Sequence, residues 1–108
     1  VVDRWIRLKN RPDAIFCISD RSAIYSLKHL KRKNIRVPQD ICVAGFGNDL
    51  IGELIEPGLT TYDVKTTQIG KAAMQLFMEQ VTTHTGFTPR VKLINGNLII
   101  RDSTRRKP

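Results

Sequence analysis

Short apolar runs and one helical stripe alternate along the first half of the chain. The runs Ala14–Ile18 and Ile41–Phe46 lack polar alternation and are too short for helices, which predicts strands buried on both faces. Between them, apolar residues recur at helical spacing over Arg21–Lys33, with Ser19 and Asp20 placed as N-caps. This order predicts a right-handed βαβ unit with parallel strands.

The rest of the chain predicts shorter elements. These are the end of a helix within 1–10, a short helix over 50–55, an extended segment over 59–62, and a third helix capped by Thr66 or Thr67 and reaching Val81. The β-prone runs 91–94 and 98–100 flank Asn95-Gly96-Asn97, which fits either a tight hairpin or a bend in one long path. The stretch 103–108 is basic and ends in proline, so we expect a frayed terminus.

The C-terminal ends of the two predicted strands carry the candidate binding residues. Parallel strands end at one edge of a sheet, where open α/β folds bind ligands, so Ser19, Asp20 and Arg21 should lie beside the loop 45–49. Asp20 has two interpretations that the pattern leaves open. It is either a plain N-cap or a ligand contact whose carboxylate accepts hydrogen bonds from sugar or ribose hydroxyls.

Composition and charge narrow the class of protein. The chain has 108 residues, which allows one small domain or a piece of a larger one, and 41% of them are hydrophobic. The first residue is Val1, so we expect the chain to begin within a longer protein. The net charge of +8 divides into +7 over 1–36, −5 over 37–63 and +6 over 64–108. Such blocks are typical of solvated helix faces and a basic tail.

Residue types for catalysis or metal binding lack the necessary spacing. Cys17 and Cys42 lie inside apolar runs, and His29 and His84 have no metal-ligand spacing and are predicted at the surface. No nucleophile–base arrangement is recognisable, and the Gly-x-Gly at Gly45 lacks the third glycine of a dinucleotide motif. The sequence therefore predicts no enzyme activity, no cofactor and no metal site.

Several motifs occur in a recognisable order. They are Arg11-Pro12-Asp13-Ala14-Ile15-Phe16, Ser19-Asp20-Arg21-Ser22-Ala23, Val37-Pro38-Gln39-Asp40-Ile41, Val43-Ala44-Gly45-Phe46, Pro57-Gly58-Leu59-Thr60-Thr61 and Ile69-Gly70. From about Arg11 to Thr104 the chain resembles the C-terminal part of the effector-binding domain of LacI/GalR-family transcription regulators. The resemblance implies an α/β fold, namely an incomplete, parallel-sheet βαβ lobe of the periplasmic-binding-protein-like type I fold.

The resemblance also implies how the chain divides. Residues 1–58 belong to the C-terminal lobe of the sensor. Residues 59–94 comprise a hinge crossing with a helix and strand that pack on an N-terminal lobe outside this chain, leaving an apolar helix face unpaired. Residues 95–102 return to the C-terminal lobe, which favours the bend over the hairpin, and residues 103–108 form a disordered tail.

The function implied is that of a sensor in a cytoplasmic repressor. A small effector, a sugar or related metabolite, binds between the lobes and alters operator binding. Contact with operator DNA is made only by an N-terminal helix-turn-helix domain outside this chain, and the regulator is a homodimer with no membrane contact. The alternative is a periplasmic sugar-binding protein of an uptake system.

Particular residues carry these expectations. The effector-binding set is Asp20, Ser19, Arg21 and Asn48, and the hinge set is Leu59, Thr60, Thr61, Asn95 and Gly96. The family usually has Asp-Asp or Asp-Asn after its Gly-Phe pair, whereas this chain has Gly47-Asn48, so only Asn48 carries over. Val64 stands where some sugar-responsive members have a glutamine that faces the cleft.

Overall fold

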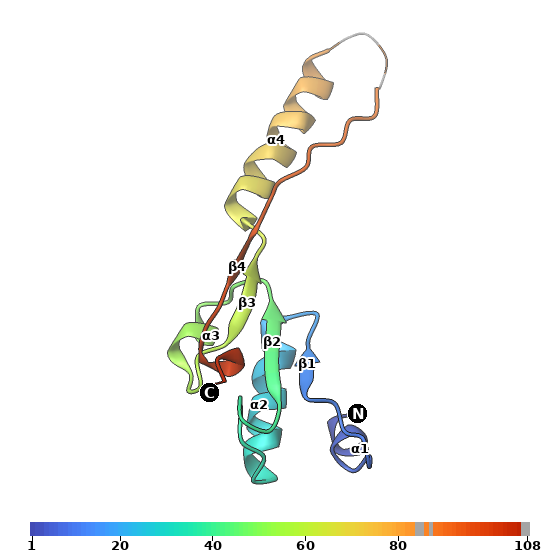
Figure 1. Ribbon diagram of the computed structural model, residues 1–108. Helices are drawn as coiled ribbons and strands as arrows, with labels where there is room; N and C mark the ends of the chain where they lie inside the picture. The colour runs from blue at the N-terminus through green and yellow to red at the C-terminus, as the bar shows by residue number, and fades with distance from the viewer. Residues whose placement is uncertain (84–85, 87, 107–108) are drawn as a thin grey trace.

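Four strands form one sheet at the base of an elongated molecule, from which a helical arm projects (Figure 1). The fold is taken from a computed structural model that describes residues 1–83, 86 and 88–106. Its extents are 61 × 26 × 23 Å, and the long dimension includes the arm. The strand order is β1-β2-β3-β4.

The predicted βαβ unit is present. Strand β1 (Ala14–Phe16) runs parallel to β2 (Cys42–Phe46), and helix α2 (Asp20–Arg32) connects them. The Ser19 side chain caps α2 by accepting a hydrogen bond from the Ser22 N–H at 3.3 Å. The apolar stripe of α2 packs on the sheet, and the buried core consists of Ile15, Ala23, Leu27, Leu30, Ile41, Val43 and Leu59.

Burial of the first strand on both faces was predicted, and this is wrong for the described chain. Ile15 is buried, but Phe16 is 65% exposed and Ile18 is 86% exposed. Strand β1 is the edge of the sheet, and its alternate side chains point away from the core that α2 covers. An apolar run does not reveal that only one face is covered.

The second half of the sheet joins strands that are far apart in sequence. Strand β3 (Thr60–Asp63) lies parallel to β2, and β4 (Asn97–Ile99) lies antiparallel to β3, with Asp63 opposite Asn97. The partner of β4 is therefore β3 and not the run 91–94, so the chain makes the bend and not the hairpin.

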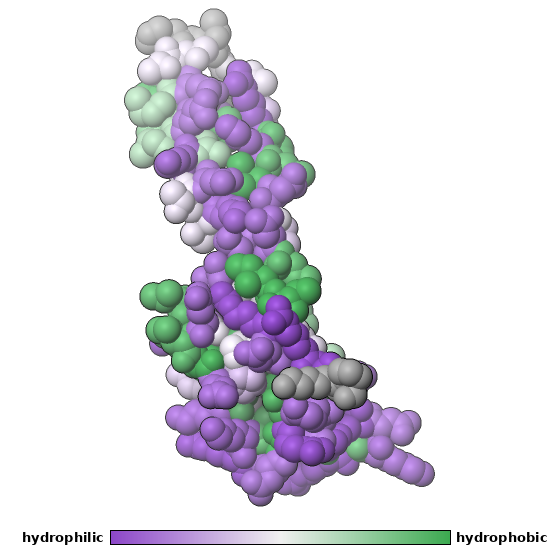
Figure 2. Space-filling model, turned by 60° about the vertical axis from the view of Figure 1, so that its left-hand side comes forward, coloured by the Kyte–Doolittle hydropathy of each residue, from purple (hydrophilic) through white to green (hydrophobic). Residues whose placement is uncertain are grey.

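Helix α4 (Thr66–Thr82) forms the arm, and the chain runs back beside it (Figure 1). Arg90 pairs with Glu79 at 2.9 Å, which joins the returning segment to the helix. The predicted cap at Thr66 or Thr67 is wrong, because the N-cap is Lys65 in a left-handed conformation with φ 59°. Figure 2 shows apolar patches along the arm. The large exposed apolar residues of α4 are Ile69, Met74, Phe77, Met78 and Val81.

Three short helical segments complete the described chain. Helix α1 (Val2–Ile6) is tied to α2 through Asp3, whose carboxylate lies 3.0 Å from His29 Nε2. Helix α3 (Ile51–Leu54) follows β2, and the 3-10 helix η1 (Asp102–Thr104) follows β4. His84 lies outside the described residues.

The tail expected over 103–108 differs from the structure at its start. Ser103 is fully buried, and its hydroxyl accepts from the Thr60 N–H at 2.8 Å and donates to the Val43 carbonyl at 2.6 Å. Arg106 donates to the carbonyls of Pro38 and Asp13. These partners lie 43 or more residues away in sequence, so local composition could not predict them; residues 107–108 lie outside the described chain.

Replacing Ser103 by alanine tests this account of the C-terminal segment. The Ser103→Ala variant leaves a buried N–H and a buried carbonyl without their hydroxyl partner. The free energy of unfolding should therefore fall by about 1–3 kcal/mol. Chemical denaturation measures the loss. Ser22→Ala, at an exposed position of α2, should change stability by less than about 0.5 kcal/mol. Equal effects of the two substitutions would contradict a structural role for Ser103.

Candidate functional site

The C-terminal edge of the sheet is organised around the carboxylate of Asp20. This side chain is only 2% exposed, at the start of α2. Its Oδ2 accepts from the Asp49 N–H at 2.6 Å, and its Oδ1 accepts from the Thr61 hydroxyl at 2.6 Å. A buried charge is costly unless donors surround it, and here the donors come from the β2–α3 loop and from β3. Asp20 therefore joins three segments at this edge.

Two glycines in β2 and the loop after it are required for different reasons. A Cβ on Gly45 would collide with Asp20 Oδ1 and lie 3.0 Å from Asp20 Cα, so only glycine lets β2 approach the helix start. Gly47 has φ 127°, a conformation that side chains rarely adopt. The loop then continues through Asn48, which has φ 57° and whose N–H donates to Thr61 Oγ1 at 3.2 Å.

The structure places the four predicted effector residues at this edge in different environments. Ser19 is half-buried and caps α2, while Arg21 is exposed. Asn48 is half-buried on the loop after β2. Asp20 is buried, and each of its carboxylate oxygens accepts one hydrogen bond from the protein, so the ligand contact remains a prediction beside this internal role. Its observed role is to hold the loop that carries Asn48.

The first predicted hinge residues belong to the sheet and its core. Leu59 and Thr61 are fully buried and Thr60 is 4% exposed, and both threonines lie within β3. The chain leaves the sheet only after Asp63, where Lys65 adopts φ 59°. The Lys65 ammonium, 2.8 Å from Asp63 Oδ2, and the Lys65 N–H hold the pKa of the Asp63 carboxyl below its usual value.

The returning segment passes close to the outgoing one. The Gly96 N–H donates to the Tyr62 hydroxyl at 3.0 Å. A Cβ on Gly96 would collide with the Asp63 carbonyl and the Tyr62 ring, so the two passages of chain touch at this point. Tyr62 also stacks on Phe46, with ring centroids 5.6 Å apart. The predicted pair Asn95 and Gly96 therefore lies beside the place where β3 ends.

Sequence reasoning missed two residues of this arrangement. Thr61 was assigned only to the hinge, yet its hydroxyl connects Asp20 to the Asn48 N–H. Arg101, which carried no assignment, donates to Asn48 Oδ1 at 3.3 Å. The Thr61–Asp20 and Arg101–Asn48 contacts span 41 and 53 residues of sequence, and no local pattern marks them.

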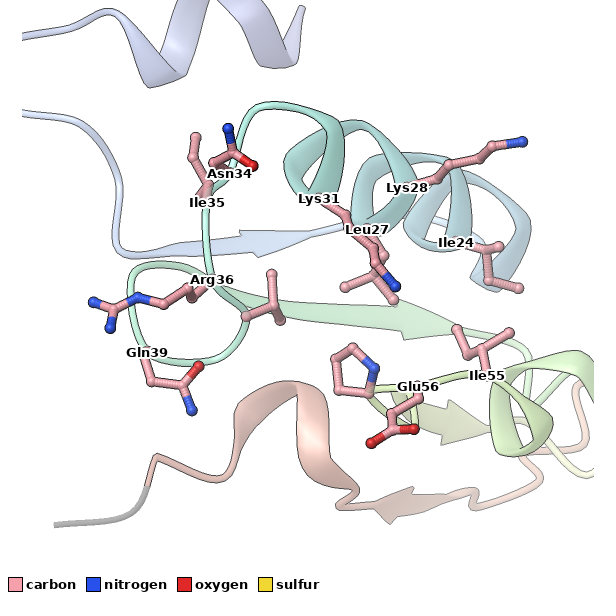
Figure 3. A pocket seen from close by; sticks show the side chains of 12 residues that line it. Ile24, Leu27, Lys28, Lys31, Asn34, Ile35, Arg36, Gln39, Ile55 and Glu56 are labelled. Carbon is pink, nitrogen blue, oxygen red and sulfur yellow. The ribbon is translucent and has the colours of Figure 1, made fainter.

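A large groove is lined by none of these edge residues. It has a volume of about 870 Å³ and lies between α2 and the segment 55–57. In Figure 3, Ile24 and Leu27 from α2 point toward Ile55 and Glu56 across this groove. Its apolar floor has a mainly basic rim. The rim includes Lys28, Lys31 and Arg36 as well as Glu56.

Two further findings concern only the part of the chain that the structure describes. No group of three or more His, Cys, Asp or Glu side chains there is placed to hold a metal ion. None of the described helices has the length and hydropathy needed to cross a membrane.

The chain is similar to a known protein family and to individual proteins of known type. Residues 1–104 match the model of the periplasmic binding protein-like domain. The chain is 38% identical over 108 residues to the HTH-type transcriptional repressor CytR of Escherichia coli K12. That alignment covers 99% of this chain and 31% of the repressor.

Solved structures agree with the sequence match. A LacI-type transcription regulator from Bifidobacterium animalis subsp. lactis superimposes with a TM-score of 0.84 and 31% identity, covering 94% of this chain and 36% of that one. A LacI family regulator from Arthrobacter sp. FB24, in complex with lactose, gives a TM-score of 0.79 and 29% identity, covering 96% and 39%. The chain thus spans about a third of the length of these proteins.

An amide substitution at Asp20 tests the role of its carboxylate. Asp20→Asn keeps the size of the side chain but places an NH₂ group where the carboxylate accepts from the Asp49 N–H or the Thr61 hydroxyl. The free energy of unfolding should therefore fall by about 2 kcal/mol. Asp13→Asn is the matched control, since that side chain is 83% exposed. Thermal or urea denaturation compares the two variants, and an Asp20→Asn protein as stable as Asp13→Asn would rule out the buried tie.

Proposed function

This chain belongs to the periplasmic binding protein-like domain family, and on that premise we propose that it senses a small metabolite, a sugar or related compound, for a transcriptional repressor. The observation that carries the proposal is the family match over residues 1–104. The similar CytR protein of Escherichia coli is a transcriptional repressor. The similar Arthrobacter regulator was solved with lactose, which supports a sugar-type effector. The competing role in sugar uptake has no such support among these relatives.

The effector binds at the C-terminal edge of the sheet, with a second lobe closing the cleft. Asn48, Ser19 and Arg21 supply polar groups at this edge, and Asp20 holds the loop in place. The stacked pair Phe46 and Tyr62 lies beside them and suits the apolar face of a sugar ring. The exposed apolar residues of α4 support a second lobe as the surface against which the arm packs.

Signalling works by a shift between two arrangements of the lobes. The effector must bind these arrangements unequally, because equal affinity would shift nothing. The bending points are the segment 63–65 and the pair Asn95–Gly96, where the two passages of chain leave and re-enter the lobe. Leu59, Thr60 and Thr61 anchor the outgoing passage to the core.

The remaining parts of the proposal concern the whole regulator. Operator DNA is bound by an N-terminal helix-turn-helix domain, and the protein acts in the cytoplasm without catalysing a reaction. The regulator is a homodimer, and the groove between α2 and Ile55 is the contact surface. The groove lining supports this assignment, because Lys28, Lys31 and Glu56 offer charges of both signs beside the apolar side chain of Ile24.

Removing the Asn48 amide tests effector binding. Asn48→Gly in the full-length regulator preserves the left-handed backbone but deletes one hydrogen-bonding group, so the effector concentration at half-maximal operator release should rise about tenfold. Lactose and related sugars serve as probes, with operator retention as the measurement. Asn10→Gly is the control because Asn10 is exposed and belongs neither to this edge nor to the lining of the groove. An unchanged midpoint for Asn48→Gly would contradict the proposed site.

A charge placed in the groove tests the dimer. Ile24→Asp should weaken the dimer at least tenfold, because a carboxylate would be buried at the centre of the contact. Analytical ultracentrifugation measures the change, and circular dichroism checks the fold. The control is Tyr25→Asp, at the neighbouring 65% exposed position outside the groove. A dimer that survives Ile24→Asp, or that Tyr25→Asp disrupts equally, would place the interface elsewhere.

A further inference from the structure

Arg101 has a rigidly held backbone and side-chain stem. Its N–H donates to Thr60 Oγ1 at 2.8 Å, and its carbonyl accepts from the same hydroxyl at 3.1 Å. A Cβ on Gly58 would lie 3.5 Å from both Cβ and Cδ of Arg101, so the stem runs directly over that glycine. The side chain is 15% exposed although it follows a strand whose first residues are exposed. Its guanidinium therefore has little freedom of direction.

The guanidinium reaches three separate segments. Nη1 donates to the Leu59 carbonyl at 2.8 Å, just before β3. Nη2 donates to Asn48 Oδ1 at 3.3 Å and lies 3.6 Å from Glu53 Oε2 of α3. A planar group with five N–H donors can serve acceptors that lie in different directions, whereas an ammonium is a single point of charge. This arrangement uses chemistry that is specific to arginine.

The contact fixes which end of the Asn48 side chain faces outward. An arginine only donates, so the group that faces it must be the amide oxygen of Asn48. The backbone of Asn48 is held as well, because its N–H donates to Thr61 Oγ1. The NH₂ group is consequently the part of the amide left for a ligand.

We infer that Arg101 is a positioning residue of the effector site, which holds Asn48 so that its NH₂ group donates to an oxygen acceptor of the effector. The inference rests on the proposed function, since it assumes that the effector binds at this edge. It also connects the edge to the returning passage of chain, because Arg101 lies two residues after the end of β4. The effector class it implies carries a hydroxyl, ring or carbonyl oxygen at this point.

The test compares Arg101→Lys with Arg105→Lys in the full-length regulator. Arg105 is an exposed neighbour whose side chain donates only to the Ile100 carbonyl, at 3.3 Å, among the described residues. Hydrogen exchange followed by mass spectrometry reports on peptides that cover residues 46–54, and it requires no effector. We expect Arg101→Lys to speed exchange of this loop about tenfold, while Arg105→Lys leaves it unchanged. Loop exchange that stays at the wild-type rate in Arg101→Lys would overturn the positioning role.

A double-mutant cycle with a sugar probe completes the experiment. Lactose, cellobiose and ribose are screened by thermal shift, and the strongest binder is titrated against Arg101→Lys, Asn48→Gly and the double variant. We expect each single variant to lose about tenfold in affinity and the double variant to lose little more, because both changes remove the same contact. Additive losses would overturn the inference. If no sugar binds the wild-type protein, the proposed function fails, and the exchange comparison alone decides the role of Arg101.

Discussion

The buried carboxylate of Asp20 is the group on which the geometry of the sheet edge depends. A charge that is 2% exposed must be surrounded by donors, and the two it has come from the loop after β2 and from the hydroxyl of Thr61 on β3. The same requirement excludes a side chain at residue 45, because a Cβ there would occupy the space of the carboxylate. One buried charge thus constrains a helix start, a loop and a strand together.

The edge and the passages of chain that leave the lobe form one connected unit. Thr61 lies on the outgoing strand, and Arg101 follows the returning strand β4. Both contact Asn48, one through its backbone N–H and the other through its amide oxygen. A change in the direction of either passage would therefore act on Asn48, the residue that we propose to contact the effector.

In the arm, by contrast, most of the apolar side chains of the helix remain exposed. Of its helix α4, only Ala72 is buried, while Ile69, Phe77 and Val81 are exposed. Amphipathic helices gain most of their stability from packing their apolar face, and most of this face is not buried by the described residues. In the returning segment beside α4, Arg90 and Lys92 donate hydrogen bonds to Glu79 and Gln75 of the helix. These polar contacts leave Ile69, Phe77 and Val81 exposed.

Local patterns in the sequence determined the βαβ unit, the cap at Ser19 and the common edge of Ser19, Asp20 and Asn48, because parallel strands must end on the same side. They left the hairpin and the bend as equal alternatives, and the tertiary structure selected the bend through the pairing of Thr61 with Ile99. Tertiary structure alone buried Ser103, gave the Asp20 carboxylate two internal donors and brought Arg101 to Asn48. The physical reason is that hydrogen bonds across 41 or more residues depend on how strands stack in space, which periodicity and capping do not encode.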